Sequence, residues 1–277
     1  MDVLEQFLQL DQYPIHDPAS EQFHAVVAAA KRQLAEFGYA ELPGFVTREG
    51  VAALVADAEE GAPTAFRSSG RGTAYLAAPD TTVAANHPLA TVMPYAVRAI
   101  PYDAVPTSSP LRQLYEMAAL TSFIAAIVDV GPLFPYGDPF GALNLAVMGE
   151  GDELQWHYDQ TDFVVSLAIQ SADAGGDFEV VPNTRTADDE HFSEVADILA
   201  GDQEKVLVLE MTPGTLLIFE GRNSLHRVSP IRGSRLRHVG LLAYDTVEGR
   251  LGSAALRQTR YGRTEPLVHP PLEWSSQ

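Results

Sequence analysis

The sequence contains no cysteine and no long apolar run. Without cysteine, the chain has no disulfide, no thiolate metal ligand and no cysteine nucleophile, which fits a reducing cytoplasm. No stretch reaches the 18 or more apolar residues that a membrane span requires. The acidic N-terminus also lacks the basic and apolar regions of a secretion signal. We therefore expect a cytoplasmic protein with no membrane partner.

Basic residues are scarce as well. The chain has 18 Lys and Arg against 37 Asp and Glu, which gives a formal net charge of −19. Because phosphate binding needs clustered Lys and Arg, this balance argues against a nucleic-acid partner. We expect most of the acidic residues on a solvated surface, where they favour solubility. Against such a background, an arginine held inside a pocket would stand out as an anion receptor.

Residues 1–130 have the pattern of a mainly helical region. Two stretches carry apolar residues at helical spacing, and Ser20 and Thr47 precede them as N-caps. Gly38 is placed to end the first helix. A third stretch, "SSPLRQLYEMAALTSFIAAIVDVG", predicts one or two packed helices with Pro110 in the first turn.

The pattern changes from helical to strand-like at about residue 141. Short segments rich in Val, Leu, Ile and Phe follow one another, each bounded by Gly, Pro, Asp or Asn. They predict an antiparallel jelly roll, a cupin-like double-stranded β-helix, over 141–247. With helices buttressing one face, the fold class is α+β, and 1–277 is expected to form a single domain. Residues 63–88 show little periodicity and predict either a loop over a site or a long surface excursion.

The stretch "LQWHYDQTDF" places His157 and Asp159 two residues apart at a predicted strand. Alternating side chains of a strand would project both to the same face. His226 follows a probable turn and opens another strand, so it could supply a third ligand. Two imidazoles and one carboxylate on one face of a metal form the arrangement of non-haem Fe(II) oxygenases. Zinc accepts the same ligands, so the ligand types alone do not select the metal.

Two arginines follow His226 and favour iron. Arg235 and Arg237 lie in the next predicted strand, on the same face as each other. A buried guanidinium is a bidentate partner for a carboxylate. An iron site with a remote carboxylate receptor is what 2-oxoglutarate requires, because its keto-acid end chelates the metal and its distal carboxylate meets the arginine.

The chain resembles the Fe(II)/2-oxoglutarate-dependent oxygenases with a double-stranded β-helix fold, and more closely their bacterial branch of free-amino-acid hydroxylases and halogenases. The matching stretches are "DPFGALNLAVMGEGDELQWHYDQTDFVVSLAIQ", "GGDFEVVPNTR" and "PGTLLIFEGRNSLHRVSPIRGSRLRHV". The resemblance implies His157, Asp159 and His226 as Fe(II) ligands, with 2-oxoglutarate and O2 as co-substrates. It implies Arg237 or Arg235 as the 2-oxoglutarate clamp, and Arg237 has the offset that is common in the superfamily. Halogenating relatives replace the carboxylate ligand by a small residue, so the Asp159 of this chain favours hydroxylation.

Further residues are candidates for binding 2-oxoglutarate or substrate. Asn144 could reach the 2-oxoglutarate carboxylate, or it could be a polar group beside a turn. Arg67 and Arg71 could hold a substrate carboxylate, or they could be solvated loop arginines. Gln160 is neutral, which suggests a substrate with a neutral side chain. The resemblance points to a small free amino acid or derivative.

Three other functions remain open at this point. The same iron site could carry out oxidative cyclisation or desaturation in natural-product biosynthesis. A jelly-roll protein could instead bind metal or 2-oxoglutarate without turnover. A zinc hydrolase could use the same three ligands without oxygen or a keto acid.

Overall fold

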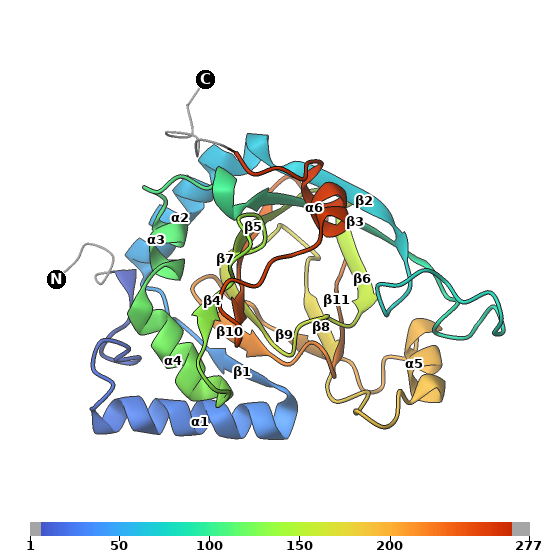
Figure 1. Cartoon of the computed structure of the whole chain (residues 1–277), viewed down its shortest axis with the longest axis horizontal. Helices are drawn as coiled ribbons and strands as arrows, with labels where there is room; N and C mark the ends of the chain where they lie inside the picture. Colours follow the sequence, from blue (N-terminus) through green and yellow to red (C-terminus); the bar gives the residue numbers. More distant parts are fainter. Residues whose placement is uncertain (1–6, 268–277) are drawn as a thin grey trace.

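A computed structural model describes residues 7–267 and shows a curled antiparallel sheet with most of its helices on one side (Figure 1). Within these residues the main sheet has 11 strands, in the spatial order β1-β10-β7-β12-β5-β3-β6-β11-β8-β9, with β2 paired to β3. A small second sheet pairs β13 with β4. The strands are β1 (Tyr39–Leu42), β2 (Phe66–Gly72), β3 (Met93–Pro101), β4 (Phe134–Pro135), β5 (Leu143–Met148), β6 (Glu153–His157), β7 (Val164–Gln170), β8 (Phe178–Val181), β9 (Leu207–Leu209), β10 (Leu216–Phe219), β11 (Leu225–Val228), β12 (Arg237–Leu242) and β13 (Tyr244–Asp245).

The helices begin and end where the sequence places caps. The side chain of Ser20 accepts a hydrogen bond from the Phe23 N–H, and that of Thr47 accepts one from the Gly50 N–H. Gly38 ends the first helix with φ 71°. The helices are α1 (Glu21–Phe37), α2 (Arg48–Gly61), α3 (Pro110–Tyr115), α4 (Ala118–Val128), α5 (Phe192–Leu199) and α6 (Ala254–Tyr261), with 3-10 turns η2 (Ala62–Thr64) and η3 (Tyr102–Ala104).

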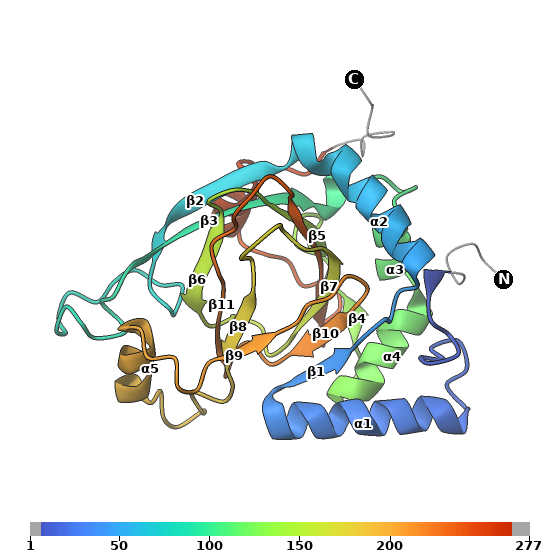
Figure 2. The same cartoon turned by 180° about the vertical axis from the view of Figure 1, so that it is seen from behind.

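Helices α1 to α4 cover one outer face of the sheet, as Figure 2 shows from behind. The main hydrophobic cluster joins Phe123 and Ile124 of α4 to the buried side chains of β5, β7 and β10. At the contact of α3 with β12, a Cβ on Gly240 would lie 2.7 Å from Leu111 Cδ1, so glycine permits the close approach. The predicted α+β class, with a jelly-roll core and buttressing helices, is confirmed.

The N-terminal half contains more β-structure than its sequence pattern indicates. β1, β2 and β3 all lie within 1–130, which was expected to be mainly helical. β2 also occupies part of 63–88, which was expected to be irregular. Most residues of β2 are exposed, so its sequence lacks the alternation of a half-buried strand. Its extended form comes from the full-length pairing with β3.

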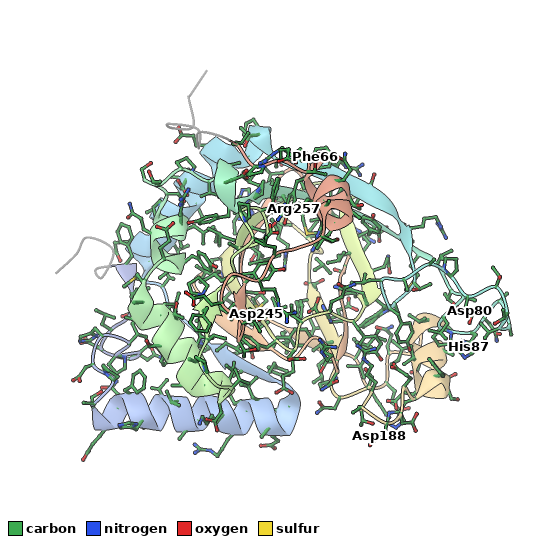
Figure 3. The ribbon with its side chains drawn as sticks, in the orientation of Figure 1. Phe66, Asp80, His87, Asp188, Asp245 and Arg257 are labelled. Carbon is green, nitrogen blue, oxygen red and sulfur yellow. The ribbon has the colours of Figure 1, made fainter. Side chains whose placement is uncertain are left out.

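The C-terminal helix α6 lies at the rim of the barrel, beside β2 and β3 (Figure 1). Its last residue, Tyr261, stacks on the ring of Phe140 with 5.5 Å between the ring centroids. Gly262 ends the helix so close to β2 that a Cβ there would lie 2.4 Å from the Phe66 ring. Figure 3 shows Phe66 and Arg257 at this part of the rim.

Two ion pairs fasten α6 and the segment after it to the barrel. Arg257 donates two hydrogen bonds to the carboxylate of Asp138, which is buried and also accepts the Gly252 N–H. Arg263 forms a bidentate pair with Asp103. Although burial raises the pKa of Asp138, the bonds from Arg257 and from backbone N–H groups hold it below its usual value.

Replacing Arg257 by Ala should release α6, because it leaves the buried Asp138 charge without its partner, at a cost of about 3–5 kcal/mol. Hydrogen exchange of 254–261 measures the opening. Arg250→Ala is the matched control, because Arg250 pairs with Asp245 at the surface, where an ion pair contributes at most about 1 kcal/mol. The stabilisation by the Asp138 carboxylate is fully present above the pKa of about 3.9 that an aspartate has in the unfolded chain. It is lost as the pH falls through the lower pKa of Asp138 in the folded state. Equal exchange in the two variants would contradict this role of the ion pair.

Candidate metal centre

Two of the predicted ligands face each other across a strand pair. β6 ends at His157, so the predicted strand does not reach Asp159, and β11 runs antiparallel to β6 with His226 directly opposite His157. The ring centroids of the two imidazoles are 4.1 Å apart. An irregularity in register follows between His226 and Val228, and such irregularities are typical of strands that aim a side chain into a site.

The third residue, Asp159, lies beyond the end of β6, so strand alternation does not position it. Its N–H donates to the carbonyl of Gly221, at 3.0 Å. A Cβ on Gly221 would lie 1.9 Å from Asp159 Oδ2. Asp159 therefore depends on a glycine that is 62 residues further along the chain and follows β10.

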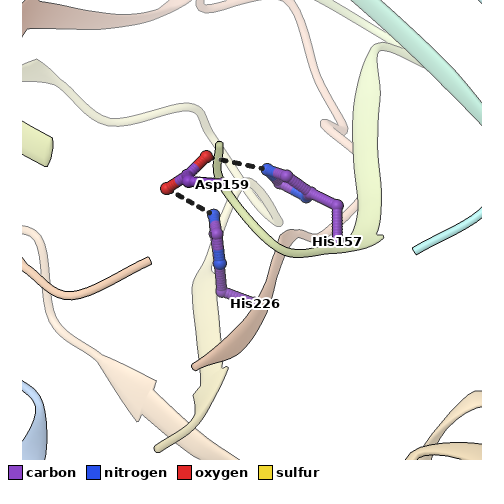
Figure 4. Close-up of side chains that lie close together, drawn as sticks. All are labelled: His157, Asp159 and His226. Atoms are coloured by element: carbon purple, nitrogen blue, oxygen red, sulfur yellow. Dashed lines mark ion pairs between the residues drawn. The ribbon is translucent and has the colours of Figure 1, made fainter. Parts of the chain in front are cut away.

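The three side chains converge as metal ligands do (Figure 4). Asp159 Oδ1 lies 3.8 Å from His157 Nε2, and Asp159 Oδ2 lies 3.5 Å from His226 Nε2. The Nδ1 atoms of His157 and His226 lie 2.7 Å and 3.0 Å from the carbonyls of Gln155 and Ser224. With the proton of each imidazole on Nδ1, the lone pair of each Nε2 is free to bind a metal and points toward Asp159. Burial, and then His226, lower the pKa of His157 to about 3, so its imidazole is neutral and can bind a metal.

These donors fit Fe(II). One candidate atom from each of His157, Asp159 and His226 lies within 4.8 Å of the others, and no other such cluster occurs among residues 7–267. Two imidazoles and a carboxylate suit non-haem iron and leave positions for further ligands. The donor set also suits zinc.

Arg237 is a buried cation with no anionic partner in the described chain. It opens β12, its side chain contacts Met148 Sδ at 3.9 Å, and residues 7–267 supply no ion pair to it. Burial lowers its pKa to about 10, against a smaller raising effect of Asp177, so it stays charged at neutral pH. It lines a cavity of about 320 Å³ together with Phe178, whose ring lies 5.6 Å from that of His226. A buried charge requires a counter-charge, and the cavity gives an anion room.

Arg235 does not share this environment. It precedes β12 instead of lying within it, and its side chain is exposed and paired with Asp173 at 3.7 Å. It also donates to the carbonyl of Ala172. The expectation that Arg235 and Arg237 lie on the same face of one strand is therefore wrong. Only Arg237 lines the cavity.

Asn144 and Gln160 are engaged elsewhere. Asn144 Oδ1 accepts the hydroxyl of Tyr261 at 2.5 Å, which ties β5 to the C-terminal helix. Its amide lies 3.4 Å from the carbonyl of Gly141. Gln160 is exposed, and its carbonyl accepts a hydrogen bond from Arg222.

Arg67 and Arg71 belong to β2 rather than to a loop. Arg67 pairs with the buried Asp152 at 3.2 Å, and Arg71 donates to the carbonyl of Val92. Both lie on the opposite face of β2 from the buried Ser68. The structure therefore does not direct these two arginines into the barrel, and the expected irregular loop is in this part a strand.

Sequence reasoning missed one contributor to the site, Gly221, and one helix of the barrel, α6. Gly221 makes room for Asp159, and its only signal is a polar Glu-Gly-Arg turn after an apolar strand. Helix α6 has clearer signals: Ser253 caps its first turn by accepting from the Leu256 N–H, and Gly262 ends it with φ 69°.

Replacing Gly221 by Ala should displace the Asp159 carboxylate and weaken Fe(II) binding by about 10–100-fold, the range found when a group that orients a metal ligand is changed. Anaerobic Fe(II) titration checks this. Gly131→Ala is the control, because a Cβ at Gly131 would meet nothing within 4 Å. Unchanged Fe(II) affinity in the Gly221 variant would refute the role given to this glycine.

Comparisons with known proteins agree with this geometry. The sequence model of the Halogenase D family matches residues 23–254. No curated protein matches the chain. Among residues 7–267, no helix combines the length and apolar character needed to cross a bilayer.

Solved structures share the fold at low sequence identity. AviO1 from Streptomyces viridochromogenes is 21% identical, over 81% of this chain and 96% of its own, with a TM-score of 0.53. The non-haem α-ketoglutarate-dependent epimerase SnoN of nogalamycin biosynthesis is 12% identical, over 90% and 96%, with a TM-score of 0.57. The carbocyclase SnoK of the same pathway is 16% identical, over 88% and 94%, with a TM-score of 0.55. The chain thus belongs to the Halogenase D family and has the fold of the Fe(II)/2-oxoglutarate-dependent oxygenases, which confirms the resemblance seen in its sequence.

Proposed function

We propose that the protein is a dioxygenase that uses Fe(II), 2-oxoglutarate and O2 to hydroxylate an unactivated C–H bond of a small free amino acid or derivative. His157, Asp159 and His226 are the proposed iron ligands, and Arg237 is the proposed receptor for 2-oxoglutarate. The observation that carries the proposal is the convergence of three metal donors, together with a buried, unpaired guanidinium in a cavity that is also lined by Phe178, whose ring neighbours that of His226.

The protein's own part in this reaction is to bind and orient the reactants and to exclude water. Bound iron, with 2-oxoglutarate and O2, supplies the oxidising power that an unactivated C–H bond requires. Arg237 donates two hydrogen bonds to the distal carboxylate and so fixes the direction of the co-substrate in the cavity. The rings of Phe178 and Phe219, 5.6 Å and 4.6 Å from that of His226, keep that side of the site apolar.

Hydroxylation is proposed over halogenation because the carboxylate ligand is present. A halide needs a coordination position that no protein ligand fills. In this chain Asp159 points at both histidines, and Gly221 provides the space that holds it there. We therefore do not propose halogenation for this chain, although the family is named after a halogenase.

We also propose that 1–277 acts as a single catalytic domain. β1, which follows the first helix, pairs with β10 and so adds an N-terminal strand to the sheet that bears the site. At the other end of the chain, Tyr261 bonds to Asn144 of β5. Both ends of the described chain therefore take part in one barrel.

A second candidate keeps the same cofactors but ends in oxidative cyclisation, desaturation or epimerisation. SnoN and SnoK, described as an epimerase and a carbocyclase, share this fold. The product mass separates the outcomes, since hydroxylation adds one oxygen, cyclisation and desaturation each remove two hydrogens, and epimerisation leaves the mass unchanged.

Adding 2-oxoglutarate to the anaerobic Fe(II) protein should produce the weak visible charge-transfer band of keto-acid chelation. Arg237→Lys should raise the 2-oxoglutarate concentration at half-maximal band by about 10–100-fold, because an ammonium cannot replace the bidentate contact. Arg235→Lys, at the surface, should titrate like the parent. If the folded protein gives no such band, the oxygenase proposal fails and the zinc-hydrolase and pure-binding alternatives are favoured.

Turnover should add one oxygen to a single member of an amino-acid panel, with succinate formed in equal amount. Mass spectrometry of the reaction mixture measures both products. Asp159→Ala should abolish product while leaving the fold intact, because Asp159 lies outside the strand ladder. A product lighter by two hydrogens would favour the second candidate.

A further inference from the structure

Thr184 lies between β8 and α5, far along the chain from the candidate metal ligands, yet its hydroxyl contacts both segments that carry them. The Tyr158 hydroxyl donates to Thr184 Oγ1 at 2.9 Å, and the Leu225 N–H donates to the same oxygen at 3.0 Å. Tyr158 stands between the first two ligands in the chain, and Leu225 directly precedes the third. One oxygen atom therefore joins the two ligand-bearing segments.

This hydroxyl bridge replaces a missing step of the sheet. The pair of His157 with His226 is the last one in the register of β6 with β11 at this end. One residue further, a continued antiparallel ladder would pair Tyr158 with Leu225. In place of a direct bond between these two residues, both donate to Thr184. The bridge thus prolongs the link between the strands at the point where the ladder stops.

The bridge is buried and its hydrogen bonds are complete. Thr184 and Tyr158 are each 2% exposed, and Leu225 is fully buried. The Thr184 hydroxyl also donates to the carbonyl of Asn223 at 3.4 Å. With two bonds accepted and one donated, it uses its whole capacity. Because a buried donor without an acceptor is unfavourable, this oxygen restricts where Tyr158 and Leu225 can lie.

The residue after Thr184 links the same two segments. The N–H of Arg185 donates to the carbonyl of Asn223 at 3.2 Å, and its Nε–H donates to that of Arg222 at 2.6 Å. Its Cζ lies 4.2 Å from the centre of the Tyr158 ring, in a cation–π contact. Arg185 therefore supports the bridge, since it too contacts Tyr158 and the turn that precedes β11.

We propose that Thr184 is a positioning residue of the metal centre, whose hydroxyl holds the segment of His157 and Asp159 in place against the strand that bears His226. This inference rests on the metal site of the proposed function and does not depend on its reaction. A site binds its ion tightly when hydrogen bonds around it hold the ligands in their binding geometry beforehand. Without the Thr184 hydroxyl, two buried donors lose their shared acceptor and the ligand segments are free to shift apart.

The alternative is that Thr184 only stabilises the fold. Removing its hydroxyl would then lower the melting temperature, as the loss of any buried acceptor does. The affinity of the folded protein for a metal ion would stay the same. Measuring that affinity well below the melting temperature therefore separates the two roles.

The experiment is anaerobic calorimetry of Fe(II), and separately of Zn(II), binding to the full metal-free chain, with a thermal melt of each variant. Thr184→Val keeps the side-chain shape without the hydroxyl and should weaken binding of both ions by about tenfold, the lower end of the range for groups that orient metal ligands. Thr184→Ser keeps the hydroxyl and should bind like the parent. Thr215→Val is the matched control, because Thr215 is also buried and its hydroxyl pairs with that of Thr212 at 3.0 Å. It should melt at a lower temperature and bind both ions like the parent.

Tyr158→Phe tests the bridge itself. It should weaken ion binding less than Thr184→Val does, because the Leu225 N–H keeps its acceptor. Thr184→Val should also cost less affinity in the Tyr158→Phe background than in the parent, since both changes remove the same hydrogen bond. Strictly additive losses would contradict a bridge through this bond.

The outcomes separate this inference from the proposed function. Parental ion affinity in Thr184→Val overturns the role of Thr184 and leaves the oxygenase assignment intact. An equal loss of affinity in Thr184→Ser and Thr184→Val also overturns it, because the hydroxyl is then not the cause. The keto-acid band of the Fe(II)-loaded parent tests the proposed function on the same samples. If the band is absent while Thr184→Val binds both ions more weakly than the parent, the oxygenase assignment fails and the role of Thr184 stands.

Discussion

The antiparallel pairing of β6 with β11 is the constraint on which the site depends. It sets His157 opposite His226, and a slip of one residue would turn one imidazole to the other face of the sheet. The pairing of β11 with β8 on its other side fixes this register further, because it places Val180 against His226 and Phe178 against Val228. Asp159 lies outside the ladder, and its position follows from the contact with Gly221. Two histidines thus depend on the sheet, and the carboxylate depends on a turn.

The interior of this acidic protein holds a cation that the fold leaves unpaired. Burying a charge without a partner destabilises a protein by several kcal/mol, so such a group persists where a ligand supplies the counter-charge. Because its pKa falls only to about 10, Arg237 remains charged at neutral pH and cannot avoid the burial cost by losing its proton. A dianionic co-substrate offsets that cost on binding. The negative surface, by contrast, repels anions at long range, so selectivity for an anion has to come from a few local positive charges.

The sequence predicted the fold class and the three convergent residues because these depend on local pattern and residue chemistry. The motif around His157 and the turn before His226 can be recognised from residue types alone. The face of Arg67 and Arg71 could not be predicted, because β2 is mostly exposed and shows no apolar alternation. Its strand form is imposed by β3, a tertiary effect. The same is true of Gly221, since nothing in the local sequence indicates that Asp159 will approach within the radius of a methyl group.

The metal ligands and the peripheral elements of the barrel belong to different parts of the structure, and this explains how one fold can serve different chemistry. SnoN and SnoK share this barrel at identities of 12% and 16%, so the barrel itself does not determine the outcome of a reaction. In the present chain, the candidate metal ligands and Arg237 lie in or next to the central strands. β2 lies off the main path of the sheet, paired with β3, and α6 packs against this strand pair. Because α6 and the segment after it are held by two arginine–aspartate pairs and by the Tyr261–Asn144 bond, the exposed side chains of α6 can vary without disturbing the residues that bind the metal.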